Sequence, residues 1–280
     1  MNKETHAPTQ TVSENCALPP LPLGEGRGKG KSTKGAAKGP HPNPLSEGER
    51  TVLDIVLPVY HEQDNLPKTI AEIERWVPQP YRVHVIYDYE EDPTVPVARR
   101  LARTRPYILL VRNHEGRGVI GALKTGVAVA GSGPVMVMMA DLSDDLSILP
   151  RMLELYRAGY HVVCPSRYMP GGQQLGGPRL KRLLSRLAGC SAYWLRGFPT
   201  HDITNNFRLY SGAMLKRLTI ESTGGFEFAL EVTVKAHRAG YRITELPTCW
   251  RDRTAGQSRF RLFHWLPLYL RWFRLGMFGR

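Results

Sequence analysis

The chain has 280 residues, of which 42% are hydrophobic and 22% are charged, and its formal net charge at pH 7 is +13. These values are ordinary for a soluble globular protein, and the length is ample for one large domain or two small ones. There is no run of about 18 apolar residues, which excludes a transmembrane helix, and the N-terminus lacks the apolar core of a signal peptide. We therefore expect a cytoplasmic protein.

The basic charge is concentrated near the C-terminus. Residues 251–280 carry seven Arg and one Asp, so this tenth of the chain holds +6 of the net charge of +13. Arginine-rich tails suit phosphate groups on lipid or nucleic acid. Residues 1–50 are rich in Pro, Gly, Ser and Lys, and we predict a disordered, low-complexity segment there. Its interspersed glutamates argue against a nucleic-acid-binding arm, so no nucleic-acid partner is expected.

From residue 51 onward, strands alternate with helices. Strands are predicted at residues 52–59, 82–87, 107–112 and 135–139. Helices are predicted from about Pro67, which suits a first turn, to Trp76, at 95–103 and at 119–130. This alternation implies right-handed βαβ units and a mainly parallel central sheet flanked by helices, which is an α/β fold.

The second half of the chain is less regular. Helices are predicted at 149–158, 179–195 and 226–239, strands at 161–165, 207–210 and 242–248, and a glycine-rich loop at 169–177. The helix at 179–195 is basic and amphipathic. Segment 259–278 combines Arg with Trp, Tyr, Phe and Leu, and we interpret it as an amphipathic helix in a membrane headgroup layer. The alternative is a terminal helix packed on the domain or docked on another subunit.

The sequence motif around which the chain is organised is an apolar strand, residues 135–139, followed by Asp141, Asp144 and Asp145. In open α/β sheets, ligands bind at the carboxyl ends of the strands. Carboxylates placed there can hold a divalent metal ion and, through it, the phosphates of a nucleotide. The competing interpretation is a solvated polar turn that caps the next helix.

A glycine pattern, residues 116–121, matches the spacing of dinucleotide-binding folds, with Asp141 twenty residues beyond Gly121. Three residues separate it from the preceding strand, whereas that fingerprint needs a tight turn. It also follows the third strand rather than the first. We therefore interpret these glycines as letting a loop pass close to a bound ligand, and keep a dinucleotide-dependent oxidoreductase as the alternative.

Several motifs in fixed order resemble family 2 glycosyltransferases of the GT-A fold, in particular the dolichyl- or polyprenyl-phosphate sugar synthases. The resemblance covers about residues 53–260. It is carried by the segments 56–62, 88–94, 116–126, 165–172, 202–208 and 252–259, with Glu231. It implies a GT-A domain at 51–258, between the disordered segment 1–50 and a basic aromatic tail at 259–280.

The resemblance also implies roles for individual residues. The residues implied to bind the nucleotide-sugar are Pro58, Tyr60, Glu62, Asp88, Gly118 and Asp141. Those implied to bind the acceptor phosphate are Arg167, Arg182, Ser185 and Arg253. The catalytic set is Asp141, Asp202, Arg167, Arg182 and Arg253, in which Asp202 would serve as a base only for a hydroxyl acceptor.

One departure concerns the metal. The family's Asp-x-Asp motif reads Met139-Ala140-Asp141 here, so its first carboxylate is missing. A Mg²⁺ or Mn²⁺ ion would keep Asp141 and recruit Asp144 or the oxygens of the nucleotide.

The expected reaction transfers a hexose from a nucleotide-sugar to a polyprenyl phosphate at the inner face of the cell membrane, with residues 259–280 on the membrane surface. A membrane-protein partner or a homo-oligomer is compatible with the tail. Two alternatives are a soluble transferase acting on a sugar or protein hydroxyl, and a domain that binds nucleotide-sugar without turnover. The sequence leaves the sugar, the base and the lipid length open.

Overall fold

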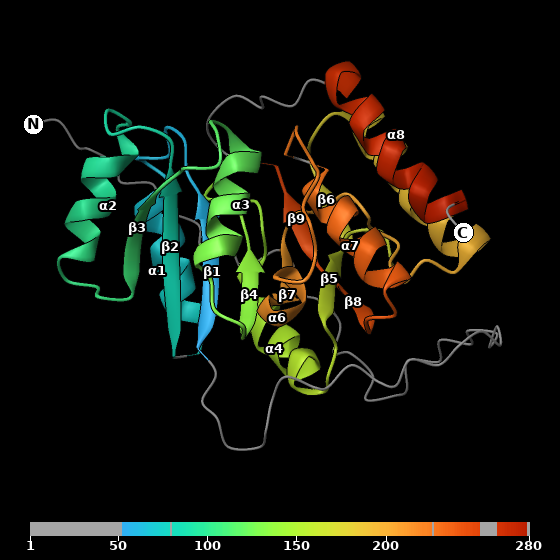
Figure 1. Cartoon of the computed structure of the whole chain (residues 1–280), viewed down its shortest axis with the longest axis horizontal. Helices are drawn as coiled ribbons and strands as arrows, with labels where there is room; N and C mark the ends of the chain where they lie inside the picture. The colour runs from blue at the N-terminus through green and yellow to red at the C-terminus, as the bar shows by residue number, and fades with distance from the viewer. Residues whose placement is uncertain (1–51, 79, 226, 253–261, 279–280) are drawn as a thin grey trace, which may run out of the picture.

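The computed structural model describes residues 52–78, 80–225, 227–252 and 262–278, and is built on a seven-stranded sheet (Figure 1). The strand order is β3-β2-β1-β4-β7-β5-β8. Only β7 runs antiparallel to its neighbours, β4 and β5. The strands are β1 (Leu53–Pro58), β2 (Tyr81–Tyr87), β3 (Ile108–Arg112), β4 (Pro134–Val137), β5 (Val162–Ser166), β7 (Arg208–Ser211) and β8 (Ile243–Pro247). The predicted α/β fold with a mainly parallel sheet is confirmed.

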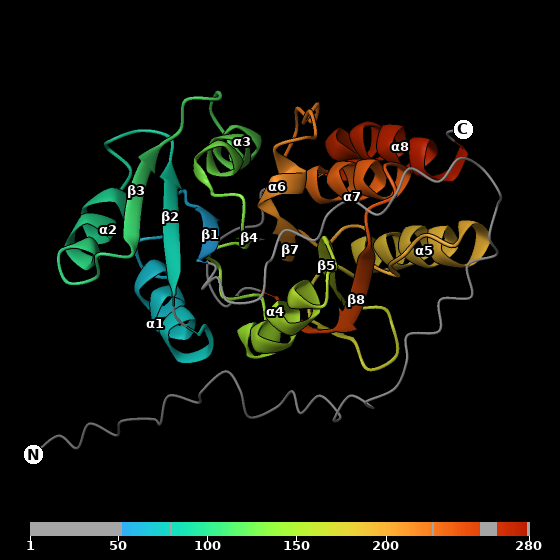
Figure 2. The ribbon, with the colours of Figure 1, turned by 60° about the horizontal axis from the view of Figure 1, so that its bottom comes forward.

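Helices cover both faces of this sheet (Figure 2). One face packs against α1 (Leu66–Trp76), α2 (Thr94–Ala102) and α4 (Leu149–Arg157), the last preceded by a short 3-10 helix, η1 (Leu146–Ile148). The other face packs against α3 (Val119–Val129), α6 (Gly212–Leu215) and α7 (Phe228–Arg238). Two further helices, α5 (Arg179–Arg196) and α8 (Leu262–Phe278), pack beside α7.

Strand β1 shows why the sequence folds this way. All six of its residues are buried. Leu53, Ile55 and Leu57 belong to the core on the α1 face, and Val56 belongs to the core on the α3 face. Side chains of a strand alternate between its two faces, and both faces of this parallel strand are covered by helices. The strand is therefore apolar at nearly every position. The buried Asp54 is the exception, and it accepts hydrogen bonds from Arg82 and His84.

The glycine-rich segment predicted as a loop contains a strand. Residues Gln173–Leu175 form β6, which pairs in parallel with β9 (Cys249–Arg251) in a second, two-stranded sheet. The prediction missed it because three residues carry no periodic signal, and the pairing joins segments more than 70 residues apart. The predicted disordered segment 1–50 lies outside the described residues.

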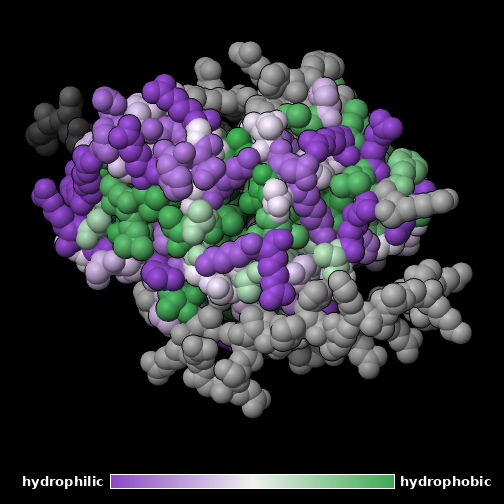
Figure 3. All heavy atoms as spheres, in the orientation of Figure 1, coloured by the Kyte–Doolittle hydropathy of each residue, from purple (hydrophilic) through white to green (hydrophobic). Residues whose placement is uncertain are grey.

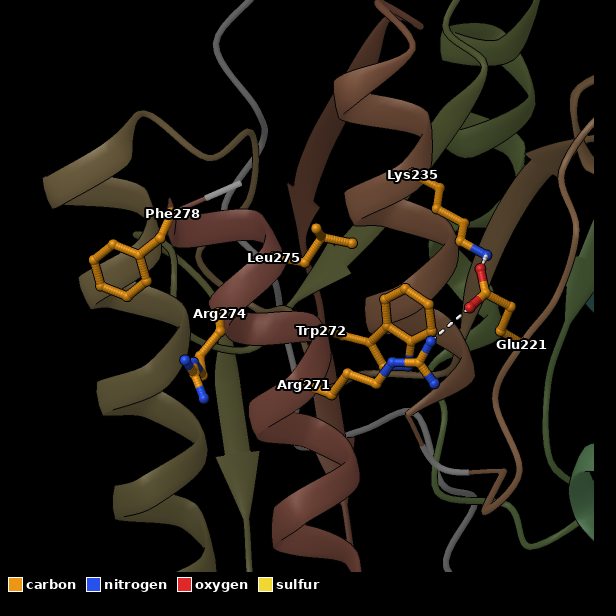
Figure 4. A pocket seen from close by; sticks show the side chains of 7 residues that line it. All are labelled: Glu221, Lys235, Arg271, Trp272, Arg274, Leu275 and Phe278. Carbon is orange, nitrogen blue, oxygen red and sulfur yellow. Dashed lines mark hydrogen bonds and ion pairs between the residues drawn. The ribbon is translucent and has the colours of Figure 1, made fainter. Parts of the chain in front are cut away.

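Helix α8 packs on the domain. Trp272 and Met277 are buried in a cluster with Phe198 and Val234, which joins α8 to α5 and α7. Figure 4 shows the neighbouring pocket, where Glu221 accepts hydrogen bonds from Lys235 at 2.7 Å and Arg271 at 2.6 Å. Both cations lie over the Trp272 ring at 4.8 Å from its centroid. The packed face of α8 therefore matches the alternative of a terminal helix docked on the domain.

The surface drawn in Figure 3 has hydrophilic residues over α2 and hydrophobic residues over the edge strand β3, where Leu109 is partly exposed. Within the described residues, no helix combines the length and apolar character that crossing a bilayer requires.

Candidate active site

Polar loops converge at one edge of the sheet. Parallel strands end on the same edge, so the segments after β1, β2, β3, β4 and β5 meet there. Because β7 is antiparallel, the segment before it, residues 202–207, reaches the same edge. Within the described chain, this arrangement brings most of the sequence-predicted site residues to one side of the molecule.

Asp88 holds the glycine loop in place. Its carboxylate accepts hydrogen bonds from Asn113 Nδ2 at 2.7 Å and from the backbone N–H of Gly118 at 2.9 Å. Asn113 also donates to the carbonyl of Gly116. Gly116 and Gly118 have φ values of +92° and +98°, which favour glycine because other residues are strained there. Asp88 and Gly118 thus form one unit at the ends of β2 and β3.

The loop after β1 carries an aromatic group. Pro58 ends the strand, and the ring of the partly exposed Tyr60 stacks on His61 with centroids 4.4 Å apart. The Nε2 atom of His61 lies 2.7 Å from the hydroxyl of Tyr89 in the acidic loop. Flat aromatic surfaces at the end of a strand suit stacking of a nucleoside base.

Glu62 and Asp92 organise the backbone below these rings. Glu62 accepts a hydrogen bond from Asn65 at 2.7 Å, and its N–H donates to the Thr94 hydroxyl at 2.8 Å. Asp92 is buried and accepts from the N–H groups of His61 and Thr94. Asp92 therefore fixes the aromatic loop to the start of α2.

The aspartates after β4 lie on a tight loop. Asp141 is buried and accepts a hydrogen bond from the N–H of Ser143 at 3.1 Å. Leu142 between them has a φ of +60°, an uncommon conformation for a branched side chain. Burial and the charge of Asp141 raise the pKa of Asp144 to about 8.

This pair of carboxylates fits a hard divalent cation, which would offset their mutual repulsion. Among the described residues there is no cluster of three or more His, Cys, Asp or Glu side chains suited to a metal. Two carboxylates match an ion that takes its other ligands from phosphate and water, as Mg²⁺ often does. A cavity of about 150 Å³ lies beside this loop. Its lining includes Ser143, Asp144, Asp145, Trp76 and Arg251.

Arg167 and Asp202 form a buried ion pair. Arg167 donates through Nε at 2.6 Å and through Nη2 at 2.9 Å to the two carboxylate oxygens of Asp202. Asp202 also accepts from the N–H groups of Arg167, Thr204 and Asn205. Burial alone would raise the pKa of Asp202, but the charge and hydrogen bonds of Arg167 hold it below its ordinary value. The Asp202 carboxylate is therefore ionised, and both of its oxygens accept hydrogen bonds from the Arg167 guanidinium.

A chain of hydroxyl groups surrounds this pair. Arg167 Nη2 donates to Thr204 at 2.9 Å, and the Thr204 hydroxyl lies 2.5 Å from that of Ser185 on α5. The Tyr168 hydroxyl lies 2.8 Å from Ser185. Half-buried Arg182 lies one turn before Ser185 on the same side of α5. Arg253, the remaining predicted phosphate ligand, lies outside the described residues.

The Asp141 loop and the Arg167 pair are electrostatically coupled. The charge of Arg167 opposes the rise in the pKa of Asp144, and the charge of Asp144 contributes to the raised pKa of Arg167. The side-chain hydrogen bonds between Arg167 and other described residues use its Nε and Nη2 atoms. The buried guanidinium and the two carboxylates therefore lie close enough to influence each other's charge.

The family model for glycosyl transferase family 2 matches residues 54–219. The chain belongs to this family. As a family 2 glycosyltransferase it is an enzyme, and the alternatives of an oxidoreductase and of a binding domain without turnover are set aside.

Two curated relatives have more specific names. The chain is 28% identical over 232 residues to polyprenol monophosphomannose synthase of Mycolicibacterium smegmatis, covering 79% of this chain and 84% of the relative. It is 28% identical over 209 residues to undecaprenyl-phosphate mannosyltransferase of Micrococcus luteus, covering 73% and 85%.

A solved structure supports the fold. A mannosyltransferase from Pyrobaculum calidifontis in complex with GDP-Man and Mn²⁺ superposes with a TM-score of 0.57 at 20% identity, covering 78% of this chain and 62% of that one. This similarity confirms the nucleotide-diphospho-sugar transferase architecture for the family 2 glycosyltransferase.

Several residues of the site had no assigned role in the sequence analysis. Tyr168 and Thr204 lie inside the motif segments 165–172 and 202–208, but only the fold shows that both share hydrogen bonds with Ser185. Asn113 precedes the glycine pattern, and in the sequence it is only one of the three residues that separate this pattern from the strand. His61 and Tyr89 carry no pattern of their own, since their contact joins loops from two strands.

Proposed function

We propose that this glycosyltransferase moves a hexose, with mannose as first candidate, from a nucleotide-sugar to a polyprenyl phosphate. The observation that carries the proposal is the Arg167–Asp202 pair with its hydroxyl chain, coupled to the Asp141 loop. Both relatives are named for mannosyl transfer to a polyprenyl phosphate, which supports the same acceptor class here.

The donor would bind across the ends of β1, β2 and β3. Tyr60 and His61 offer ring surfaces for the base, and Asp88 holds Gly118 so that the backbone comes close to the ligand. The donor diphosphate then points toward Asp141, because β4 neighbours β1 in the sheet. Aromatic stacking accepts any nucleoside base, so these rings do not select one base over another.

In the reaction, an acceptor phosphate oxygen forms a bond to the anomeric carbon, and the bond from that carbon to the diphosphate breaks. A phosphate is already anionic near neutral pH, so no general base is needed. Arg167 would hold the acceptor phosphate through Nη1, with Arg182, Ser185 and Arg253 as further ligands. Asp202 fixes the guanidinium plane, which makes it a positioning residue in this proposal.

A divalent metal ion would be held by Asp141 with Asp144 and would stabilise the negative charge of the departing diphosphate. Mn²⁺ accompanies GDP-Man in the similar mannosyltransferase structure. The pairing of Asp202 with Arg167 disfavours the alternative of a hydroxyl acceptor, because that reaction requires a carboxylate free to take a proton.

We place the enzyme at the inner face of the cell membrane, because a lipid acceptor and a water-soluble donor meet at a membrane surface. The basic segment 259–280 is one candidate for the contact. On α8, the exposed side chains include Leu270 and Phe278, while Trp272 is packed inside.

The test uses the purified full chain, several labelled nucleotide-sugars, Mg²⁺ or Mn²⁺, and detergent-dispersed polyprenyl phosphate, followed by extraction of labelled lipid. Polyprenol, which has a hydroxyl in place of the phosphate, is the matched acceptor control. We expect product from the phosphate alone, and loss of product with EDTA or with Asp141→Asn. Asp145→Asn is the control variant, since Asp145 accepts from Ser147. Equal transfer to polyprenol would contradict the proposal.

A further inference from the structure

Helix α5 presents a long apolar stripe to solvent. Six of its large hydrophobic side chains have exposed fractions between 39% and 75%. They are Leu180, Leu183, Leu184, Leu187, Trp194 and Leu195. With about 100° of rotation per residue, these side chains fall within a sector of about 120° on one side of the helix. Contiguous apolar surface of this kind marks an interaction site.

The opposite side of α5 is tied to the proposed acceptor site. Ser185 joins the hydroxyl chain of Thr204 and Tyr168. Tyr193 stacks on His201 with centroids 3.6 Å apart, and a Cβ on Gly189 would lie 1.9 Å from the His201 carbonyl oxygen. The helix therefore cannot turn its leucines inward without breaking the Arg167 site.

The charges of α5 select the kind of partner. Its 18 residues include five cations and no Asp or Glu. Arg179 and Arg186 are exposed beside the stripe, and within the described chain neither makes an ion pair. A second copy of this chain or another neutral apolar surface would gain nothing from these cations. An anionic lipid surface satisfies both features, since acyl chains accept the leucines and headgroup phosphates accept the arginines.

We propose that α5 lies in the headgroup layer of an anionic membrane, with its leucine stripe toward the acyl chains. In this orientation the Ser185 side of the helix faces the domain, one helix diameter (~10 Å) from the headgroup layer. An acceptor phosphate therefore has only to pass α5 to reach Arg167, while the far end of its chain stays in the bilayer. Because it gives the polyprenyl acceptor its route, this role of α5 rests on the proposed function. The contact is made by an element inside the catalytic domain, separate from segment 259–280.

The first measurement is co-sedimentation of the full chain with vesicles of phosphatidylglycerol and phosphatidylcholine, compared with phosphatidylcholine alone. The test variant is Leu183→Gln with Leu187→Gln. The control is Leu109→Gln with Val129→Gln, which removes exposed apolar side chains from β3 and α3. We expect each α5 leucine to contribute about tenfold to the vesicle partition coefficient, and the control to bind as the wild type does. Equal melting temperatures show that both variants are folded.

The second measurement follows Trp194, which is 75% exposed. Vesicles with brominated acyl chains should quench its fluorescence, and Trp194→Phe should lose that quenched component. Absence of quenching, or α5 variants that bind like the control, would overturn the proposal, as would a dimer in solution that the α5 variant dissociates. Transfer to detergent-dispersed polyprenyl phosphate tests the proposed function separately, and the α5 variants should keep that activity.

Discussion

Arg167 illustrates how one side chain acquires a defined direction. Two of its guanidinium nitrogens donate to Asp202, and the centroids of the Tyr168 and Trp250 rings lie 5.0 Å and 5.9 Å from its guanidinium carbon. A buried charge pair of this kind adds little net stability, because desolvation offsets the attraction. In the proposed reaction, the value of this pair lies in holding the guanidinium rigidly where the acceptor phosphate would bind.

Arg167→Lys tests this rigidity. Lysine keeps the charge but cannot pair with both carboxylate oxygens and keep a further planar donor edge. We expect kcat/KM for polyprenyl phosphate to fall about 100-fold, while the affinity for the nucleotide-sugar stays unchanged. The control is Arg186→Lys, an exposed arginine of α5. A similar loss in both variants, or weaker donor binding in Arg167→Lys, would contradict this role.

At the scale of elements, the glycine loop between β3 and α3 depends on close backbone packing. A Cβ added to Gly121 would lie 1.7 Å from the carbonyl oxygen of Gly116 and 2.9 Å from Asn113 Nδ2. The loop would have to open, which would break the hydrogen bonds that Asp88 and Asn113 make with it. Gly118 has open space around its Cβ position, so a substitution there costs only backbone strain.

We therefore expect Gly121→Ala to lower the melting temperature and to weaken nucleotide-sugar binding about tenfold or more, measured by calorimetry. Gly118→Ala is the comparison variant and should cost about 1–2 kcal/mol of stability through its positive φ. Stronger loss of binding in Gly118→Ala than in Gly121→Ala would show that the contact with Gly116 does not set the loop.

The packing of α8 leads to a second prediction at this scale. Trp272 is 3% exposed and contacts the cluster that joins α5, α7 and α8. Trp272→Ala should lower the free energy of unfolding in urea by about 3–4 kcal/mol, because it opens a large cavity. Phe278→Ala is the control, since that ring is 65% exposed, and should change stability by less than about 0.5 kcal/mol. Equal effects would mean that α8 is not part of the folded core.

For the molecule as a whole, the sequence predicted the alternating half of the fold well and the rest less completely. Helices and parallel strands up to β4 follow from apolar runs and spacing, because the apolar residues of these elements recur with helix or strand periodicity and pack into the two cores. The partnership of Arg167 with Asp202 spans 35 residues, and no periodicity encodes it. Likewise, a sequence pattern marks α5 as amphipathic, but only the fold shows that its apolar side is uncovered.

At the sheet edge opposite the site, Asp54 links three neighbouring segments of the molecule. This residue of β1 accepts hydrogen bonds from Arg82 and His84 of β2 and from the N–H of Gly131 before β4. Burial alone would raise the pKa of Asp54, but the hydrogen bonds from His84 and Arg82 outweigh it and hold the pKa below the ordinary 3.8. Such a carboxylate stabilises the fold above pH 3.8, and this stability is lost as the pH falls through the lower folded-state pKa.

Asp54→Asn should therefore lower the free energy of unfolding at pH 7 by about 2 kcal/mol, because Arg82 and His84 lose the buried negative charge to which they donate hydrogen bonds. The slope of unfolding free energy against pH below about pH 4 should become shallower than in the wild type, since one linked proton is gone. Glu72→Gln is the control, since Glu72 pairs with Arg75 at 4.0 Å on the surface. An unchanged slope in Asp54→Asn, measured by urea titrations at each pH, would show that other carboxylates govern acid unfolding.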